Sequence, residues 1–578
     1  MATAALLLPD CAPAHPAGVR AALPPPGTPR IRRQVERSVG WDRVVALALD
    51  PDALGADMLD AVLDAAGAFA AETLEPVNEA MDRVGARVEN GRVRTAPGHR
   101  AAWRAYLEAG WPTLEAEPEH GGQGLPSTLA FAAQALFDRA CPAFGMLPVP
   151  QRSAARLIAA FGGPAERERW LPGLASGELG ATICISEPDA GSDLNRLRAR
   201  AERGADGTWR ITGEKSWISF GDHDLTDEIG HCVLARTLLP DGSSRPSLFL
   251  VPSRLPDGSR NMVSLRRIEE KMGLHGSPTC ALGFEGAHAV LLGEPGRGLQ
   301  QMFVMIANMR LAVGAMGLGI ADSALDVAAG YAETRIQGGR EPVAIAEHPD
   351  VRRQLLDMGG DVECLRGLLF AVANLNETAA RSPDEAERAG ARALAQWLLP
   401  IVKTLGGEIA FDTASRAAQV LGGAGYTRDW PVEQALRDAR VLTIFEGTTG
   451  MQALDLVQRR LLGDGAGYQA FLVSAGEEAG NAPQLARLLD RLDARAGALR
   501  AEPGDAPANA TAFLSLAGRA ALGWIAARLA QLDGDAPEDR HLRAAGEHAL
   551  ERLAAEDGAP LIARAALAER FAAIRPGR

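Results

Sequence analysis

Apolar residues recur every three or four positions over most of the chain, but one internal stretch follows a different pattern. Residues 58–81 and 302–335 both show the helical repeat. From about residue 181 to 299 the segments are short, rich in β-branched residues and separated by Gly, Asp and Pro. That composition is typical of antiparallel strands. The patterns therefore predict helices, a β domain, more helices and a helical extension.

These changes of pattern divide the chain into five parts. Residues 1–40 are rich in Ala, Pro and Arg without a sustained period, and we expect a flexible or loosely docked arm. A helical domain (41–180), the β domain (181–299), a second helical domain (300–463) and an extra helical domain (464–578) follow. Gly314, Gly317 and Gly319 fall inside a long helical pattern, which favours close helix packing over a nucleotide-binding loop. The chain has no Rossmann or P-loop glycine motif.

Composition narrows the function classes. The chain has 578 residues and a formal net charge of −13, which argues against nucleic acid as the main partner because phosphate binding needs a basic surface. The six cysteines include no CxxC pair, so we expect no metal site, no disulfide framework and a reducing, cytoplasmic location. We find no apolar run that we expect to span a membrane.

One carboxylate stands between two helical patterns in residues 441–462. Gly447 ends the first pattern directly after Glu446, and Thr449 with Gln452 forms a capping box that begins the second. A carboxylate beside apolar residues such as Phe445 has a raised pKa and can act as a base near neutral pH. The alternative is a surface glutamate in an ordinary interhelical turn, which this stretch alone would favour.

Other motifs combine turns with polar or aromatic side chains. ICISEPDAGSD (183–193) starts as a strand and breaks at a Pro/Gly turn with Ser186 and Ser192, although a simple β-turn would look similar. GEKSWIS (213–219) places Trp217 in a strand, where a flat indole can cover the face of a ring system. A lone strand tryptophan belongs more often to the core. QVLGGAGY (419–426) is a weak signal by itself.

Together these stretches resemble one family. ICISEPDAGSD and GEKSWIS, then KMGLHGSPTC (271–280) with Arg310 and YAETR (331–335), then QVLGGAGY and IFEGTTGMQ (444–452) follow the order and spacing of the FAD-dependent acyl-CoA dehydrogenases. The resemblance implies a mainly α fold with a central β-barrel, a C-terminal four-helix bundle and a helical extension. It also implies α,β-dehydrogenation of an acyl-CoA thioester, with electrons passing to an electron-transfer flavoprotein.

The resemblance assigns roles to individual residues. Glu446 matches the catalytic base, and substrate contacts fall on Ser192, Arg310 and Gly447. Arg335 matches an arginine that meets the FAD diphosphate, usually from the neighbouring subunit. The larger bacterial branch of the family often pairs into dimers, so we expect a homodimer. The implied FAD contacts are Ile185, Ser186, Gly191, Ser192, Trp217, Ile218, Ser219, Arg335, Gln419, Gly422, Gly423 and Thr448.

Some positions depart from common members of the family. Phe445 replaces a tyrosine, Gly450 replaces a glutamine near FAD, and Ala307 stands where straight-chain enzymes often have an acidic residue. Together with HDLT (223–226), HPDVRR (348–353) and the extra helical domain, these features resemble the larger bacterial branch that includes 3-(methylthio)propanoyl-CoA dehydrogenase. We therefore expect a short-chain or methylthio-acyl substrate.

Two other function classes stay open. One is a flavin oxidase or monooxygenase on the same fold. The other is a non-catalytic flavoprotein that binds DNA or protein. The presence of Glu446 and the acidic net charge count against the second class.

Overall fold

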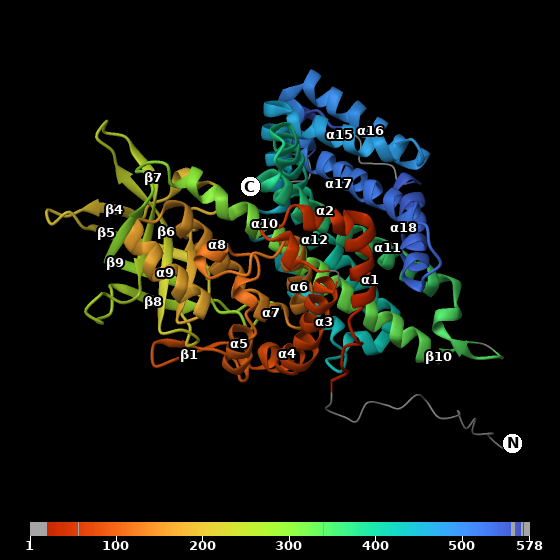
Figure 1. The fold of residues 1–578 in the computed structure, drawn as a ribbon, viewed down its shortest axis with the longest axis horizontal. Coiled ribbons are helices and arrows are strands. Elements are labelled where there is room, and N and C mark those ends of the chain that lie inside the picture. The colour runs from red at the N-terminus through yellow and green to blue at the C-terminus, as the bar shows by residue number, and fades with distance from the viewer. Residues whose placement is uncertain (1–19, 56, 339, 556–560, 568–569, 571–578) are drawn as a thin grey trace, which may run out of the picture.

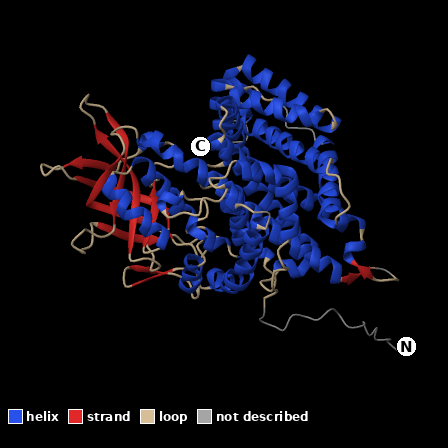
Figure 2. Cartoon of the chain, in the orientation of Figure 1, coloured by secondary structure: helices blue, strands red, loops and turns tan. Residues whose placement is uncertain are grey.

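The structure is a computed structural model that describes residues 20–55, 57–338, 340–555, 561–567 and 570. The strands of the β domain gather at one end of the molecule, and helices with two short hairpins form the rest (Figures 1 and 2). This arrangement confirms the expected fold class, mainly α with a central β-barrel.

The N-terminal part is helical, and Phe69, Tyr106 and Phe137 pack their rings against one another in its core. A short hairpin that the periodicity does not predict, β1 (Arg87–Glu89) with β2 (Arg92–Arg94), turns at Asn90 and Gly91, which both have positive φ. The helices are α1 (Thr28–Gln34), η1 (Val35–Gly40), α2 (Trp41–Ala46), η2 (Pro51–Ala53), α3 (Met58–Phe69), η3 (Ala70–Leu74), α4 (Glu75–Arg83), α5 (His99–Glu108), η4 (Trp111–Thr113), η5 (Pro118–His120), α6 (Ser127–Ala140), α7 (Pro142–Gly145), α8 (Pro148–Phe161) and α9 (Pro164–Ser176).

The structure corrects the expectation of a flexible or loosely docked arm for residues 28–40, which are helical and firmly packed, while residues 1–19 lie outside the described residues. Helices α1 and η1 cover this segment, and Ile31 and Val35 are buried against the helical core. Arg33 donates two hydrogen bonds of 2.6 Å to Asp539 in α18 (Pro537–Ala555). The Ala/Pro/Arg bias hid these contacts because two apolar residues and one ion pair leave no sustained period.

The middle domain is a closed sheet. Its strands run in the order β3-β6-β4-β5-β9-β7, β7 pairs back onto β6, and β8 pairs with β9. Two pairings, β3 with β6 and β4 with β6, are parallel, which the expectation of antiparallel strands missed. The strands are β3 (Leu179–Cys184), β4 (Arg200–Arg203), β5 (Trp209–Ser219), β6 (Glu228–Leu238), β7 (Ser244–Pro252), β8 (Val263–Ile268) and β9 (Thr279–Leu292).

Three long helices form the centre of the second helical domain: α10 (Gly298–Thr334), α11 (Pro349–Arg381) and α12 (Glu385–Leu421). Helix α10 packs on α12 where a Cβ on Gly317 would lie 2.1 Å from the carbonyl oxygen of Gly406. A Cβ on Gly319 would lie 2.5 Å from the carbonyl oxygen of Ala135 in α6. The glycines therefore serve close helix packing, as the sequence predicts. The remaining elements are the hairpin β10 (Ile336–Gln337) with β11 (Val343–Ala344), η7 (Ile345–Glu347), η8 (Gly422–Tyr426), α13 (Val432–Arg440), η9 (Val441–Thr443), α14 (Thr449–Leu454) and η10 (Asp455–Asp464).

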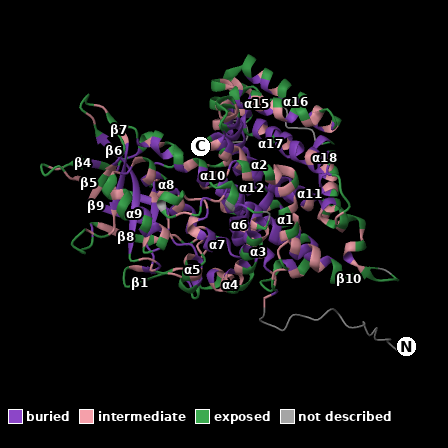
Figure 3. Cartoon of the chain, in the orientation of Figure 1, coloured by how far each residue is buried: buried purple, intermediate pink, exposed green. Residues whose placement is uncertain are grey.

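The extra helical domain packs against α11 and α12, and buried residues run continuously from the bundle into it (Figure 3). It consists of α15 (Ala466–Ala479), α16 (Pro483–Ala501), η11 (Pro503–Asp505), α17 (Ala506–Ala530) and α18. Trp397 of α12 meets Tyr468, Phe471 and Phe513 from this domain, so it shares the core of the bundle.

Two described helices, α10 and the segment Pro503–Ala530, are long and apolar enough to cross a membrane by length and composition. The expectation that no apolar run would suffice is therefore corrected. The most apolar windows of the two helices are 72% and 78% buried inside the protein, and core helices pass the same test.

Candidate active site

Glu446 lies in a turn between two helical elements, as its sequence context predicts. The turn follows α13 and η9 and precedes α14. The cap of α14 differs from the predicted one, because Thr448 rather than Thr449 accepts from the backbone N–H of Met451 at 3.3 Å. Gln452 does not complete a capping box. Its amide instead donates to the carbonyls that precede the helix.

The backbone of the turn is strained and firmly held. Glu446 has φ of +54°, a conformation that a non-glycine residue adopts at a cost. The Gln452 side-chain amide donates to the carbonyl oxygens of Glu446 (3.0 Å) and Gly447 (3.3 Å). Lys403 Nζ, from the interior of α12, also donates to the Gly447 carbonyl at 2.8 Å. The backbone N–H of Glu446 donates to no acceptor in the described part of the chain.

The Glu446 carboxylate lies in an environment suited to a base. Removal of water by the surrounding protein raises the pKa of Glu446 above its ordinary value, while the positive charges of Arg310 and Lys403 partly oppose this shift. Arg310 is itself paired with Asp455 at 3.0 Å. Phe445 packs with Val313 and Met316 of α10, which gives the turn an apolar wall. The raised pKa makes the Glu446 carboxylate a stronger proton acceptor than an ordinary surface glutamate.

Trp217 presents its indole to solvent at the end of β5. The register of β5 against β9 shifts between Lys215 and Ile218, which is a β-bulge, and Trp217 has φ of +64°. Bulges of this kind redirect a side chain away from the sheet. The Trp217 side chain is 62% exposed, whereas Ile218 beside it is buried. The common reading of a strand tryptophan as core does not apply here.

The ICISEPDAGSD turn is fixed directly beside this bulge. The backbone N–H of Ser216 donates to the Ser186 carbonyl at 2.9 Å. Lys215, fully buried, donates to the Ile185 carbonyl at 2.9 Å and pairs with Glu187 at 2.8 Å. Ile185, Ser186 and Ser219 are half-buried, while Gly191 and Ser192 are exposed. The structure therefore brings this group of predicted residues together.

A loop between β8 and β9 connects the β domain with the segment that leads to Glu446. The backbone N–H of Leu274, at φ of +51°, donates to Asp438 in α13 at 2.6 Å, and Asp438 lies eight positions before Glu446. The same loop reaches the end of β5, where the Phe220 N–H donates to the Pro278 carbonyl at 2.8 Å. Hydrogen bonds thus link the Trp217 bulge and the Glu446 turn through two elements.

The other predicted cofactor residues lie elsewhere in the same chain. At 1.5 Å per helical residue, Gln419 lies about 24 Å along α12 from Lys403, and Arg335, just past the end of α10, lies about 37 Å from Arg310. A ring contact of 5.2 Å between Tyr331 and Trp430 brings the end of α10 next to the segment after η8. The residues at the far ends of α10 and α12 therefore lie well away from Lys403 and Arg310, the residues nearest the Glu446 turn.

The residues beside the Trp217 bulge (Ile185, Ser186, Gly191, Ser192 and Ser219, here called the Trp217 group together with Trp217) and the glycines after α12 have surfaces that suit a flavin nucleotide. An exposed aromatic face at Trp217 is available for stacking. A Cβ added to Gly191, Gly422 or Gly423 would meet nothing within 4 Å, so the backbone there is open to a ligand. Thr448, also exposed, adds a hydroxyl close to the base.

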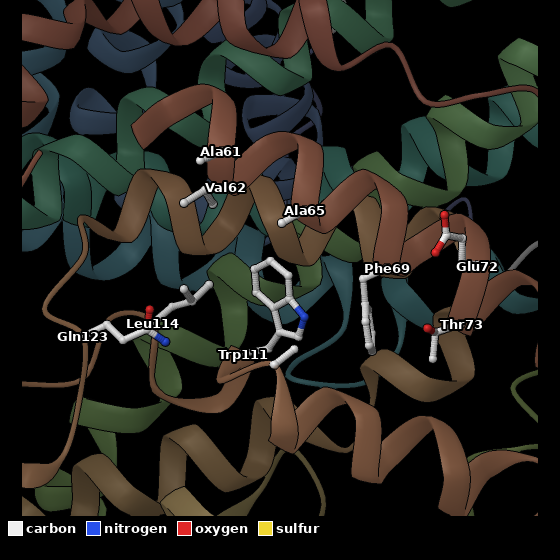
Figure 4. A pocket seen from close by; sticks show the side chains of 10 residues that line it. Ala61, Val62, Ala65, Phe69, Glu72, Thr73, Trp111, Leu114 and Gln123 are labelled. Atoms are coloured by element: carbon white, nitrogen blue, oxygen red, sulfur yellow. The ribbon is translucent and has the colours of Figure 1, made fainter. Parts of the chain in front are cut away.

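A surface hollow of about 420 Å³ lies away from these residues. Phe69, Trp111, Leu114 and other residues from α3, η3 and η4 line it (Figure 4). It contains none of the predicted site residues, and its lining is mainly apolar. We therefore do not assign the chemistry to it.

Three residues that support the site have no role assigned from the sequence, although Glu187 and Lys215 stand inside the motifs ICISEPDAGSD and GEKSWIS. Lys403, Lys215 and Glu187 hold backbone carbonyls or amides in place, yet none was among the predicted site residues. Lys403 stands in the apolar run WLLPIVKTLGG (397–407), and a lysine in such a run signals a buried partner. Among the described residues no group of three or more His, Cys, Asp or Glu could hold a metal ion.

The sequence matches family models and known proteins. Three family models match: the acyl-CoA dehydrogenase N-terminal domain over residues 57–178, the middle domain over 182–287 and the C-terminal domain over 296–462. The chain is 37% identical over 521 residues to the 3-methylmercaptopropionyl-CoA dehydrogenase of Ruegeria pomeroyi, covering 85% of this chain and 88% of that protein.

Solved structures resemble the fold over almost the whole chain. ACDH-11 of Caenorhabditis elegans matches with a TM-score of 0.78 at 19% identity and covers 97% of this chain and 98% of its own. An acyl-CoA dehydrogenase of Bacillus anthracis, solved in complex with FAD, matches with a TM-score of 0.71 at 21% identity and covers 92% and 91%. The extra helical domain is thus included in the likeness.

Proposed function

This chain belongs to the acyl-CoA dehydrogenase family, and we propose that it dehydrogenates a short-chain or methylthio-acyl-CoA between Cα and Cβ with Glu446 as the base. The family makes it a flavin-dependent oxidoreductase that acts on acyl-CoA. One observation carries the choice of base: Glu446 has a raised pKa and sits on a turn whose carbonyls are held by Gln452 and Lys403.

The residues of the turn divide the chemistry between them. Glu446 removes the α-proton of the thioester. Its own backbone N–H, which has no acceptor within the described residues, donates to the thioester carbonyl oxygen and stabilises the negative charge that develops there. Phe445 and the apolar residues packed around it exclude water from the acyl chain.

We propose FAD as the flavin. When bound, it supplies the acceptor for the hydride that leaves Cβ. Trp217 would stack against its ring system, and Ser186, Ser219 and Thr448 would offer hydroxyl groups to hold it. Exposed glycines allow close backbone approach.

A second copy of the chain would complete the cofactor site. Gln419 and Arg335 lie about 24 Å and 37 Å along α12 and α10 from Lys403 and Arg310, the two charged residues nearest Glu446, and Gly422 and Gly423 follow Gln419. In a homodimer the group from one protomer can meet the flavin held by its partner, where Arg335 would pair with the diphosphate. We also propose an electron-transfer flavoprotein as the acceptor and a cytoplasmic location.

The substrate class is tested by an anaerobic panel of acyl-CoA thioesters, scored by bleaching of the oxidised flavin band. We expect a yellow protein with about one FAD per chain, and faster bleaching with butanoyl-CoA or 3-(methylthio)propanoyl-CoA than with palmitoyl-CoA. The relative from Ruegeria pomeroyi supports the sulfur-containing substrate. Preference for palmitoyl-CoA would overturn the substrate class.

The same panel decides between function classes. If no thioester bleaches an FAD-loaded protein, the proposed dehydrogenation fails. Rapid oxygen consumption during turnover in air would instead indicate the flavin oxidase or monooxygenase class.

A further inference from the structure

Lys403 is a charged residue in the interior of the bundle. It lies in the middle of α12 between Val402 and Thr404, and its side chain is 0% exposed. Burying an ammonium group is costly unless it is paired or hydrogen-bonded. In the described part of the chain its one hydrogen bond goes to the carbonyl oxygen of Gly447 at 2.8 Å. The partner of this buried lysine is therefore the backbone directly after Glu446.

Gln452 holds the same turn from the other side. It is also 0% exposed, and its amide donates to the carbonyls of Glu446 and Gly447. A Cβ on Gly447, at φ of +91°, would lie 2.8 Å from the Gln452 amide nitrogen. The neutral Gln452 amide thus bonds to both carbonyls of the strained turn, and the charged Lys403 ammonium bonds to the Gly447 carbonyl.

Charged groups from several elements face Lys403 and Glu446. Arg310 of α10 and Lys403 of α12 both lower the pKa of Glu446, against the larger effect of burial. Glu408, one turn further along α12, also faces Lys403, and Arg440 of α13 faces Glu408. Arg310 forms an ion pair with Asp455 of η10, and Arg460 forms an ion pair with the same carboxylate.

Lys403 differs from Arg310 in that it makes no ion pair within the described residues. Burial lowers the pKa of Lys403 to about 8, so the ammonium form is present at neutral pH. Its charge is not offset by a carboxylate in contact. Because it reaches the Gly447 carbonyl directly, it can affect both the position and the ionisation of Glu446.

We propose that Lys403 is a positioning residue for the base: it fixes the Gly447 carbonyl so that the Glu446 carboxylate and backbone N–H face the substrate, and its charge favours the ionised form of Glu446. This inference rests on the proposed function. The simpler alternative is a structural lysine that only fills the helix interface. The two readings differ in what happens to the pH dependence of turnover.

The test compares Lys403→Met, which keeps the length and removes the charge, with Lys403→Arg, which keeps the charge. Gln452→Met serves as the matched neutral control, since it removes the other donor to the same carbonyl. Each purified protein is checked for urea unfolding midpoint and FAD content. Steady-state kcat and KM are then measured with the best acyl-CoA between pH 5.5 and 9.

For Lys403→Met we expect kcat to fall by about tenfold to a hundredfold, the scale of a small displacement of a catalytic group. KM should change little. The acid limb of the kcat profile should move to higher pH by about one unit, because an opposite charge near Glu446 has been removed. Lys403→Arg should keep the limb at the parent position and recover part of kcat. Gln452→Met should lower kcat without moving the limb.

Two results would overturn the proposal. One is a folded, FAD-loaded Lys403→Met whose acid limb coincides with that of the parent. The other is an equal shift of the limb in Gln452→Met. Glu446→Gln is measured alongside: if it retains turnover, the proposed base fails, whereas an inactive Glu446→Gln with an unshifted Lys403→Met profile refutes only the role of Lys403.

Discussion

Replacing Glu446 by Gln removes the proton acceptor and leaves the turn in place. The contacts that hold the turn run from Gln452 and Lys403 to backbone carbonyls, so the substitution does not touch them. The carboxylate makes no hydrogen bond or ion pair within the described residues, and glutamine has nearly the same volume. The variant should therefore fold, bind FAD and bind acyl-CoA.

The size of the effect follows from the lost step. Removal of a general base costs about a hundredfold to ten-thousandfold in rate. At about 1.4 kcal/mol for each factor of ten, this raises the barrier by about 3 to 6 kcal/mol. The free energy of unfolding, in contrast, should not fall. A carboxylate whose pKa is raised by burial destabilises the fold above its unfolded pKa, so a neutral amide should match or slightly raise the urea midpoint at pH 8.

The assay is anaerobic stopped-flow mixing with the best acyl-CoA, following the oxidised flavin band. Glu408→Gln is the matched control, because Glu408 is a second carboxylate with a raised pKa that bonds to Thr449 in the same segment. We expect a bleaching rate near that of the parent for Glu408→Gln. A bleaching rate for Glu446→Gln within a few-fold of the parent would show that Glu446 is structural and that another group is the base.

Three further predictions concern stability. Lys215→Met breaks the buried pair with Glu187, so the urea midpoint should fall by the equivalent of about 3–5 kcal/mol, and the double variant with Glu187→Gln should recover part of it; no recovery would contradict a pairing effect. Gly317→Ala should destabilise by about 1–3 kcal/mol because its Cβ meets a backbone carbonyl, while Gly476→Ala in α15, with open space around it, should be neutral or stabilising; similar midpoints for both would refute the packing account. The free energy of unfolding should fall as the pH drops from about 6.5 toward 4. Burial lowers the pKa of three histidines, so in this range the unfolded chain binds more protons than the folded one. The loss at pH 5 should be about 2 kcal/mol for each of these histidines. His99→Leu should show a smaller loss than the parent between pH 7 and pH 5, and an identical loss would contradict this. The three histidines are His99 (pKa about 3), His223 (about 4) and His231 (about 4).

The order of helical and β regions could be predicted because each has a long, distinct period. The three glycines of α10 could be assigned to helix packing for the same reason, since they fall on a continuous helical repeat. The closure of the sheet and the parallel pairing of β3 with β6 could not be predicted, because period alone does not tell which strands pair. The docked arm was missed because its burial rests on Ile31, Val35 and the Arg33 contact to Asp539.

Within the site, Glu446 and Trp217 could be predicted, but the contacts of the lysines that support them could not. Glu446 and Trp217 stand in stretches that resemble a family, and the structure places them in linked elements. Lys403 and Lys215 contact backbone atoms from segments far away in sequence, 44 and 30 residues respectively. Backbone carbonyls carry no side-chain identity, so a contact to them leaves no pair of matching residues to find.

Strained backbone positions also could not be predicted from the sequence, and in the structure they mark the site. Of the five described non-glycine residues with positive φ, Asn90 lies in a hairpin turn, where asparagine is expected. The other four are Trp217, Phe220, Leu274 and Glu446, none of a residue type that favours this conformation.

Each of these four residues costs about 1–3 kcal/mol and persists only where surrounding contacts impose it. Such contacts are present: the Phe220 amide bonds to Pro278, and the Leu274 amide bonds to Asp438. The carbonyls at Glu446 and Gly447 are held from two helices. Because all four lie on the path from the Trp217 bulge to the Glu446 turn, the contacts that keep this strain also fix the base relative to the exposed indole. Removing one of these contacts should therefore lower kcat clearly while it changes the urea unfolding midpoint little.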